Sequence, residues 1–288
     1  MIKKAIILCG GTGSRMFPLT HSINKQLLPV YDKPMFYYPL SLMMLCGIKE
    51  YIFIINQDQE QNFRKVLGDP DDLGIKVEFV VQKNPKGLPD AFLITKELIK
   101  NQSIAMILGD NFFYGQNLSK LLLSSTKLIK GAKIILHKVI KPELYGVAKV
   151  NKRNKIINIQ EKPKKKISDL AITGLYFFDN KVTKYAKKLK PSKRGEVEII
   201  DLLKFYKKKN ELSADLIGRG GAWLDTGSMD DFYKTSNFVS AIENRQGLKI
   251  ACLEEIAFNN GWIGKKELKE AIKFYGNCSY SDYIKKLI

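Results

Sequence analysis

The chain has 288 residues, and its content of 45% hydrophobic and 10% aromatic residues is that of a globular protein rather than a disordered one. The formal net charge is +19, but only six of the 48 basic residues are arginines and the lysines are scattered, so a solvated lysine-rich surface is favoured over a nucleic-acid-binding protein. No apolar run is long enough to span a bilayer and the four cysteines have no paired spacing, so we expect a cytoplasmic protein without membrane spans or a disulfide framework.

The first predicted strand ends in a glycine-rich turn. Residues 5–9 are apolar and of strand length, a Gly-Gly-Thr-Gly turn follows at 10–13, and Arg15 and Lys25 come after it. Glycines let the backbone approach a ligand closely, their N–H groups can line an anion site, and the two cations supply charge for phosphates. Because open α/β sheets bind ligands at the carboxyl ends of their strands, this stretch predicts a nucleotide-phosphate site.

The turn is neither of two well-known glycine-rich phosphate motifs. The dinucleotide pattern G-x-G-x-x-G would need a glycine where Met16 stands, and the P-loop would need its second glycine where Arg15 stands. A strand and such a turn are in themselves equally well explained as a tight turn without a ligand. The cations Arg15 and Lys25, together with Gln26, favour the nucleotide interpretation.

Strands and helices alternate after this turn. The predicted helices lie at 34–45, 59–67, 89–100 and 118–129, and the predicted strands at 51–55, 76–81 and 104–108. This alternation with short connections predicts a mainly parallel sheet with right-handed crossovers.

The second half changes to a mixed sheet with hairpins and then to a helical tail. The expected strands are 132–139, 145–151, 155–160, 170–178 and 212–217, with a short apolar segment at 222–224; the expected helices are 197–207, 254–258, 265–275 and 281–287. Ser228, with Asp231 three residues later, forms a capping-box-like start of a further helix. The predicted fold class is α/β: a Rossmann-like, open, mixed and mainly parallel sheet flanked by helices, with a smaller mixed-sheet part and a helical C-terminal tail.

Two aspartates are candidate metal ligands. Asp110 follows an apolar strand and a glycine, at the carboxyl end where the ligand crevice is expected, and Asp225 stands in Trp223-Leu224-Asp225-Thr226-Gly227. Mg²⁺ carried by a nucleotide is bound by one or two carboxylates together with phosphate oxygens. Taken alone, an aspartate after a strand is equally well explained as the cap of a turn.

Two stretches near the start resemble the sugar-1-phosphate nucleotidylyltransferases. They are Gly-Gly-Thr-Gly-Ser-Arg-Met-Phe-Pro-Leu-Thr (10–20) and Asn-Lys-Gln-Leu-Leu-Pro-Val-Tyr-Asp-Lys-Pro-Met (24–35). Leu108-Gly109-Asp110-Asn111, Glu161-Lys162-Pro163 and Trp223–Gly227 extend the resemblance over nearly the whole chain. Cys9 and Asn24 stand where alanine and serine are expected, and neither departure removes a charged group.

Within this family the chain is most similar to the members that use dTTP. The resemblance implies Mg²⁺-dependent nucleotidyl transfer from dTTP to α-D-glucose 1-phosphate, giving dTDP-glucose and pyrophosphate as the first step towards dTDP-L-rhamnose or related dTDP-deoxysugars of cell-surface polysaccharide. It also implies a homo-oligomer, expected to be a tetramer, and a possible dTDP-sugar inhibitor at a second site at a subunit interface. An enzyme that uses UTP or another nucleoside triphosphate, and a non-catalytic regulatory subunit, are the alternatives.

The resemblance assigns residues to each substrate within one domain, 1–288, whose parts are 1–130 (nucleotide-binding), 131–227 (sugar-binding) and 228–288 (helical). The residues expected to be catalytic are Arg15, Lys25 and Lys162, and the expected metal ligands are Asp110 and Asp225. The nucleotide-binding residues it implies are Leu8, Gly10, Gly11, Thr12, Gly13, Arg15, Lys25, Gln26, Gln82, Pro85, Gly87 and Asp110. The sugar-phosphate-binding residues it implies are Asn111, Tyr145, Gly146, Glu161, Lys162 and Thr173.

One loop departs from the family pattern. Gly87-Leu88-Pro89-Asp90-Ala91 stands where Gly-Leu-Ala-Gln-Ala is expected, and Pro89 has no backbone N–H. Gln82 and Gly87 keep their implied role at the base, whereas no contact is carried over for residues 88–90. His21 and His137 accompany no nucleophile motif and are interpreted as structural, and residues 196–199 are expected to support the sugar site from behind.

Overall fold

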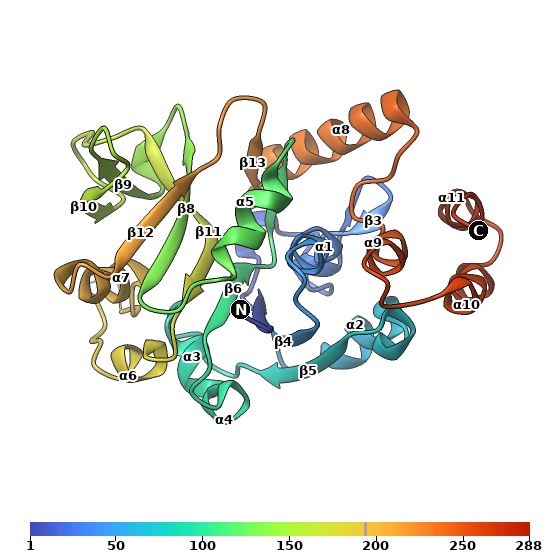
Figure 1. Cartoon of the computed structure of the whole chain (residues 1–288), viewed down its shortest axis with the longest axis horizontal. Coiled ribbons are helices and arrows are strands. Elements are labelled where there is room, and N and C mark those ends of the chain that lie inside the picture. The colour runs from blue at the N-terminus through green and yellow to red at the C-terminus, as the bar shows by residue number, and fades with distance from the viewer. Residues whose placement is uncertain (193–194) are drawn as a thin grey trace.

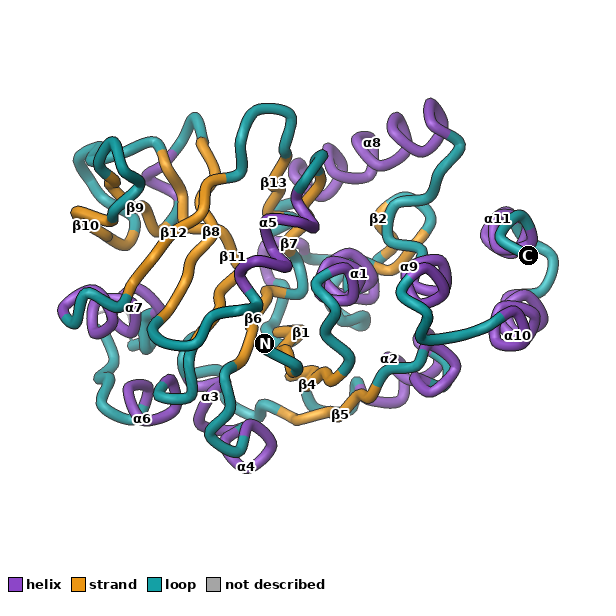
Figure 2. The backbone as a smooth tube through the Cα atoms, in the orientation of Figure 1, coloured by secondary structure: helices purple, strands orange, loops and turns teal. Residues whose placement is uncertain are grey.

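Nine strands of the described residues form one mixed sheet through the middle of the molecule (Figures 1 and 2). The structure is a computed structural model, and it describes residues 1–192 and 195–288. The strand order is β10-β9-β11-β6-β1-β4-β5, with β8 paired to β11 and β12 paired to β8. These strands are β1 Lys4–Cys9, β4 Glu50–Ile55, β5 Lys76–Val81, β6 Ile104–Leu108, β8 Ala132–Lys138, β9 Gly146–Val150, β10 Ile156–Glu161, β11 Leu170–Phe178 and β12 Leu212–Leu216.

The strands β6, β1, β4 and β5 run parallel. In β1, Ala5 lies between Tyr51 of β4 and Ala105 of β6. Residues 5–9 are apolar because a central parallel strand is covered on both faces. β11 joins β6 in the antiparallel direction and leads into the mixed region of β8, β9 and β10. The predicted fold class is thereby confirmed.

Helices lie on both faces of the sheet, so the side chains of β1 alternate between two cores (Figure 1). Ala5, Ile7 and Cys9 belong to the core that contains α1, and Ile6 belongs to the core that contains α3, α6 and α7. The helices are α1 Tyr37–Leu45, α2 Glu60–Leu67, α3 Asp90–Ile94, α4 Lys96–Ile99, α5 Leu118–Ser125, α6 Val182–Ala186, α7 Ile199–Lys208, α8 Met229–Gln246, α9 Leu253–Asn259, α10 Lys265–Tyr275 and α11 Ser279–Lys285. Short 3₁₀ turns are formed by Ser14–Met16, Lys25–Leu27, Pro70–Leu73 and Pro142–Leu144.

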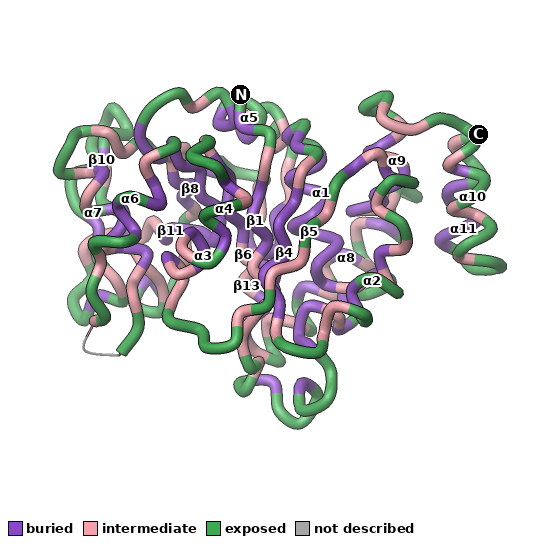
Figure 3. The backbone as a smooth tube through the Cα atoms, turned by 90° about the horizontal axis from the view of Figure 1, so that it is seen from below, coloured by how far each residue is buried: buried purple, intermediate pink, exposed green. Residues whose placement is uncertain are grey.

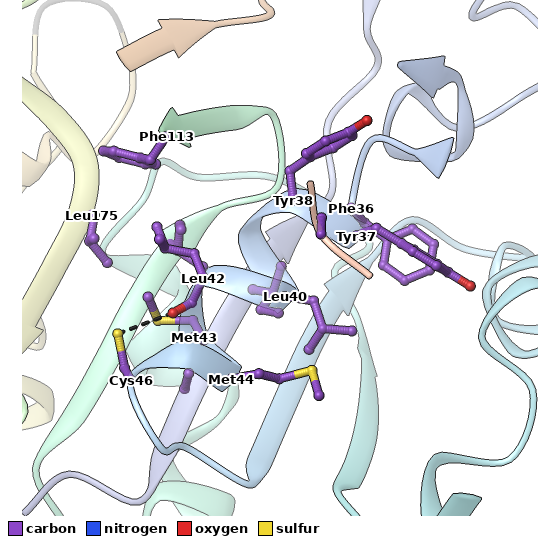
Figure 4. Packing of buried hydrophobic residues seen from close by; sticks show 14 of the residues in the cluster. Phe36, Tyr37, Tyr38, Leu40, Leu42, Met43, Met44, Cys46, Phe113 and Leu175 are labelled. Atoms are coloured by element: carbon purple, nitrogen blue, oxygen red, sulfur yellow. Dashed lines mark hydrogen bonds between the residues drawn. The ribbon is translucent and has the colours of Figure 1, made fainter. Parts of the chain in front are cut away.

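Helix α1 is apolar on all sides and lies inside the larger core (Figure 4). Met43 and Met44 are fully buried, and Leu45 is the one residue of the helix that is exposed. The thiol of Cys46 donates to the backbone oxygen of Leu42 at 3.1 Å, just beyond the end of the helix. A helix without a polar face is stable only when other elements enclose it, and here the sheet and the C-terminal helices do so.

Three predicted helices differ clearly from the structure, and one helix of the structure was not predicted. The helix expected at 34–45 begins at Tyr37, because Lys33–Pro34 forms strand β3 with β2 (Pro29–Val30). The helix expected at 89–100 is divided into α3 and α4 at Thr95, whose hydroxyl donates to the backbone oxygen of Ala91 (2.6 Å). The helix expected at 118–129 ends at Ser125, and α6 has no counterpart among the predicted elements.

A small two-stranded sheet next to the main one was also not predicted. It pairs β7 (Asn111–Tyr114) with β13 (Ala222–Asp225), two segments that are far apart in the sequence. The helix that follows, α8, begins as expected, since the Ser228 hydroxyl accepts the backbone N–H of Asp231 at 3.2 Å. No helix in the described part of the chain has both the length and the apolar character needed to cross a membrane.

The C-terminal helices form a small core of their own at one end of the molecule (Figures 1 and 3). Glu254 of α9 is buried and accepts hydrogen bonds from the hydroxyls of Tyr275 (2.8 Å) and Tyr280 (2.6 Å). The hydroxyls of Tyr275 and Tyr37 lie 3.3 Å apart, which connects this end of the chain to α1. The predicted helical tail therefore packs against the main body rather than extending from it.

Candidate active site

The glycine-rich turn follows β1 at the carboxyl edge of the parallel strands. Gly11 and Gly13 have φ angles of 102° and 63°, a region that residues with a side chain rarely adopt. Asn56, the residue after β4, holds the turn: its side-chain oxygen accepts the N–H of Gly11 (2.9 Å) and its amide nitrogen donates to the backbone oxygen of Gly11 (2.7 Å). Sequence reasoning missed Asn56, although a polar residue directly after a neighbouring parallel strand is a usable signal.

Asn24 fixes the segment that carries Lys25. Its amide donates to the backbone oxygen of Cys9 (2.9 Å), and its side-chain oxygen accepts the N–H of Gln26 (2.9 Å). Lys25 is buried, and its ammonium donates to Asp110 at 2.7 Å. The side-chain oxygen of Gln26 is buried and has no hydrogen-bond partner among the described residues, as expected of a group that meets a ligand donor.

Three more predicted residues lie in or beside the turn: Leu8, Gly10 and Thr12. The backbone oxygen of Leu8 is already used, because it accepts the N–H of Gly109 (2.8 Å), and Thr12 is exposed at the tip of the turn. The hydroxyl of Thr20 donates to the backbone oxygen of Gly13 (2.8 Å) and closes the far side of the turn. Gly10 lies next to Gln82, since a Cβ atom on Gly10 would come within 3.4 Å of the side-chain oxygen of Gln82.

Of the two predicted metal ligands, Asp225 is the last residue of β13 and Asp110 directly precedes β7, so both lie at the same end of the small sheet. Asp225 pairs with Asn111, the residue after Asp110, and the N–H of Thr226 donates to the backbone oxygen of Asp110 (3.0 Å). Burial alone would raise the pKa of Asp110, but the ammonium of Lys25 outweighs it and lowers this pKa below its ordinary value. Burial and the nearby charge of Asp110 raise the pKa of Asp225 to about 6.

This pair of carboxylates fits a divalent cation shared with a nucleotide. A partly buried carboxylate whose pKa a second carboxylate raises is stabilised by a cation, and Mg²⁺ uses one or two carboxylates plus phosphate oxygens. Across residues 1–192 and 195–288 there is no group of three or more acidic, histidine or cysteine side chains able to hold a metal by itself. The donors present therefore suit an ion that arrives with phosphate ligands.

A cavity of about 240 Å³ lies beside this pair and holds most of the predicted sugar-phosphate residues. Gly146 leaves no room for a side chain, because a Cβ atom there would meet Ile200 at 2.9 Å and the carboxylate of Glu161 at 3.1 Å. The backbone N–H of Lys162 donates to the backbone oxygen of Tyr145 (3.0 Å) and so fixes Lys162 at the rim. The predicted site residues that line the cavity are Arg15, Tyr145, Gly146, Glu161, Lys162 and Asp225.

Arg15 joins the two halves of the site. It comes from the glycine-rich turn, yet it lines the same cavity as Lys162 and Asp225. Its guanidinium lies against Gly227, where a Cβ atom would come within 2.9 Å of it. The glycine-rich turn and the predicted sugar-side residues, which are about 150 residues apart in the sequence, therefore converge on one cavity.

Asn111 and Thr173 lie beneath the cavity rather than in its wall. The side-chain oxygen of Asn111 accepts the N–H of Gly174 (3.0 Å) and the indole N–H of Trp223 (2.6 Å). The hydroxyl of Thr173 donates to the backbone oxygen of Ile135 (3.0 Å), and both side chains are buried. Their direct contact with a sugar phosphate stays a prediction.

Residues that sequence reasoning placed behind the sugar site are part of the cavity wall. They come from the segment before α7 and the start of that helix, and they are Glu196, Val197, Glu198 and Ile199. Leu88, from the loop before α3, also lines the cavity, although no contact was predicted for it. Gly87 has a φ angle of 108°, and a Cβ atom there would lie 2.1 Å from the backbone oxygen of Val197, so only glycine fits. Pro85 is exposed in the same loop, and a direct contact with the base stays a prediction.

Comparisons with known proteins agree with this site. The family model described as nucleotidyl transferase matches residues 4–242. Proteins named glucose-1-phosphate thymidylyltransferase from Neisseria meningitidis and Mycobacterium tuberculosis are 44% and 39% identical to this chain, each over 285 residues that cover 99% of both proteins. Their similarity extends through the C-terminal helices, beyond the part that the family model covers.

Solved structures give the same result. A glucose-1-phosphate thymidylyltransferase chain of Bacillus anthracis, in complex with sucrose, superposes with a TM-score of 0.75 at 36% identity, covering 82% of this chain and 94% of that one. A UDP-glucose pyrophosphorylase complexed with UDP-glucose superposes with a TM-score of 0.73 at 26% identity, covering 85% and 100%. The chain belongs to the nucleotidyl transferase family.

Proposed function

We propose that the protein transfers a thymidylyl group from dTTP to α-D-glucose 1-phosphate and releases pyrophosphate. The observation that carries this proposal is the position of Arg15, which links the glycine-rich turn to the cavity of Lys162 and Asp225. The full-length relatives named glucose-1-phosphate thymidylyltransferase support the choice of substrates. The product would supply dTDP-L-rhamnose or related dTDP-deoxysugars.

The reaction proceeds by in-line attack of a sugar-phosphate oxygen on the α-phosphorus of dTTP. That oxygen is largely ionised at neutral pH, because the second pKa of a phosphate monoester is about 6. No general base is needed, which agrees with a described cavity lining that contains no histidine or cysteine. Catalysis then consists of positioning and charge stabilisation.

Three cations divide this work in the proposal. Lys162 holds the attacking phosphate at the cavity rim, and Arg15 and Lys25 stabilise the β- and γ-phosphates as pyrophosphate leaves. Lys25 is paired with Asp110 in the structure. In the proposal, the ammonium of Lys25 therefore turns to the triphosphate and the carboxylate of Asp110 to the cation when both bind. Asp110 and Asp225 would hold Mg²⁺, which, when bound, neutralises charge at the α-phosphate.

The direct test is a pyrophosphate-release assay of each nucleoside triphosphate against a panel of sugar 1-phosphates. Release should be fastest with dTTP and glucose 1-phosphate and should depend on Mg²⁺. A preference for UTP would instead favour the alternative of a UTP-using enzyme, the class to which the similar UDP-glucose pyrophosphorylase belongs. No release with any pair would favour a regulatory subunit, and salt-sensitive retardation of nucleic acid without release would favour a nucleic-acid-binding protein.

We also propose a homotetramer with a second nucleotide-sugar site. A cavity of about 740 Å³, larger than the first, lies between α1, the end of β7 and the segment before α9. Leu45 and Leu248 line it and are 43% and 56% exposed, so apolar surface is open at its mouth. A dTDP-sugar that inhibits without competing with glucose 1-phosphate would support this site, and strictly competitive inhibition would oppose it.

A further inference from the structure

The amide of Gln82 is held between the glycine-rich turn and α3. Gln82 follows β5 directly, and its side-chain oxygen lies next to Gly10, on the edge of the sheet where the turn begins. Its amide nitrogen donates to the carboxylate of Asp90 at 2.9 Å. Asp90 is the first residue of α3 and stands where the family pattern has glutamine. The two side chains are neither fully buried nor fully exposed.

The carboxylate of Asp90 determines which way this amide points. An ionised carboxylate only accepts hydrogen bonds, so the amide nitrogen must face it and the amide oxygen must face away. The opposite orientation would place the oxygen of Gln82 against a carboxylate oxygen, with two acceptors in contact. Among the described residues, the oxygen of Gln82 has no hydrogen-bond partner of its own, and the amide nitrogen keeps a second hydrogen.

We propose that Asp90 is a positioning residue that sets base specificity by fixing the orientation of the Gln82 amide. This inference rests on the proposed function and on the role at the base of the nucleoside triphosphate that the family resemblance implies for Gln82. So oriented, the amide offers an acceptor and an adjacent donor along one edge. The ligand class that matches is a pyrimidine with an imide N–H beside a carbonyl oxygen, which is the edge of thymine and uracil.

Cytosine has the reverse pattern on the same edge, a ring nitrogen acceptor beside an amino donor. It would be matched only after the amide of Gln82 turned over, and Asp90 opposes that turn. Asparagine at position 90 both donates and accepts, so it would allow either orientation of Gln82. The charge of Asp90, rather than its size, is therefore the feature that excludes cytosine.

The test compares kcat/KM for dTTP and dCTP in the wild-type protein and in Asp90→Asn. The substitution should lower the dTTP-to-dCTP ratio by about tenfold, the scale of one mismatched hydrogen bond, chiefly by raising kcat/KM for dCTP. The value for dTTP and the KM for glucose 1-phosphate should stay within about threefold. Glu97→Gln, an exposed carboxylate change in the next helix, should leave the ratio unaltered.

A merely structural role of Asp90 predicts a different result. If Asp90→Asn lost dTTP turnover but kept the dTTP-to-dCTP ratio of kcat/KM, the inference would be overturned. It would also be overturned if Asp90→Asn changed this ratio equally in a Gln82→Ala background, where Asp90 has no amide to orient. If Asp90→Asn does not fold, Asp90→Ser, whose hydroxyl also donates and accepts, replaces it. The proposed function and this inference fail in different ways. A wild-type protein that does not use dTTP would overturn the proposed function. A wild-type protein that uses dTTP, but whose dTTP-to-dCTP ratio does not change in Asp90→Asn, would overturn only the inference about Asp90.

Discussion

Asp110, directly before β7, and Asp225, at the end of the paired strand β13, lie close together but have opposite electrostatic environments. Asp110 has Lys25 as a direct partner, which lowers its pKa, whereas burial and the charge of Asp110 raise the pKa of Asp225 to about 6. A partly buried carboxylate with a raised pKa weakens the fold at neutral pH, so its presence favours a task for its charge. In the proposed reaction that task is to bind the cation that accompanies the triphosphate.

Asp110→Asn and Asp225→Asn should each reduce kcat with Mg²⁺ at least about 100-fold, because a lost charge-stabilising group costs about 10²–10³-fold. In metal-free protein, Asp225→Asn should unfold at the same or a higher temperature than the wild type, since the charge it removes is disfavoured by burial and by Asp110. Steady-state kinetics and thermal unfolding measure the two effects. Either variant with more than a tenth of wild-type activity would remove that residue from the metal site.

Arg15→Ala should lower kcat far more than it raises the KM for glucose 1-phosphate, because the guanidinium stabilises charge on the departing pyrophosphate. Lys162→Ala should instead raise the KM for glucose 1-phosphate, because this ammonium holds the attacking phosphate. Initial rates over a range of both substrates give the two constants. Identical defects in the two variants would contradict the division of roles.

At the scale of elements, the β2–β3 hairpin is connected to the C-terminal half by a network of charged side chains. Lys33 is only 2% exposed and donates to Glu243 of α8 (2.8 Å) and to Asp32. Lys249, after α8, also pairs with Asp32 and with Glu243 (3.2 Å). A buried network of this kind fixes the relative position of its elements only while every charge keeps a partner.

Asp32→Asn should lower the free energy of unfolding at neutral pH by about 1.5–3 kcal/mol, the range for hydrogen bonds to charged groups. Burial would raise the pKa of Asp32, but Lys33 and Lys249 outweigh it and lower this pKa. The stabilisation is therefore present above the unfolded pKa of about 4 and disappears as pH falls through the lower folded pKa. Denaturant unfolding at several pH values should show that the difference in free energy of unfolding between variant and wild type shrinks below about pH 4. The control is Asp230→Asn, on the exposed face of α8. A difference that stays constant with pH, or an equal loss of stability in Asp230→Asn, would contradict this role of Asp32.

The sequence alone predicted the elements whose pattern is local. The strands around β1, the glycine-rich turn and the α8 cap depend on apolar runs, glycines and a single capping residue, and all were recognised. The pairing of β7 with β13 was not, because it joins segments about 110 residues apart. The clamp of Asn56 on Gly11, which joins segments 45 residues apart, was missed for the same reason. The contact of Asp90 with Gln82 is local, but it depends on how the loop between β5 and α3 folds back, which no apolar pattern or capping residue indicates.

At the scale of the whole molecule, the two halves of the active site come from two regions of one mixed sheet (Figure 2). The parallel strands carry the turn with Arg15 and Lys25, and the antiparallel strands carry Glu161 and, directly after it, Lys162. The boundary between the two regions is the antiparallel contact of β11 with β6. Residue types predicted the chemistry of each half, whereas only the fold shows that Arg15 reaches the sugar side.

The protein should be a homotetramer in solution. The exposed apolar side chains at the mouth of the second cavity, together with a helical C-terminal part that lines no part of the active-site cavity, are the physical basis for this expectation. Light scattering at micromolar concentration measures the mass directly. Leu248→Glu, which places a charge at that mouth, should shift the distribution to smaller species; a monomeric wild-type protein would contradict the expectation.

Thymidylyl transfer is tested most directly by competition between dTTP and UTP with glucose 1-phosphate as the acceptor and the two sugar nucleotides separated as products. The bases differ by one methyl group and the sugars by one hydroxyl, and each such difference is worth about 1–3 kcal/mol in a binding site. Gln82 and Gly87 are expected to meet the edge that thymine and uracil share, so we predict a ratio of kcat/KM that favours dTTP, but only modestly. A ratio below one, with UDP-glucose as the main product, would contradict thymidylyl transfer while leaving nucleotidyl transfer in place.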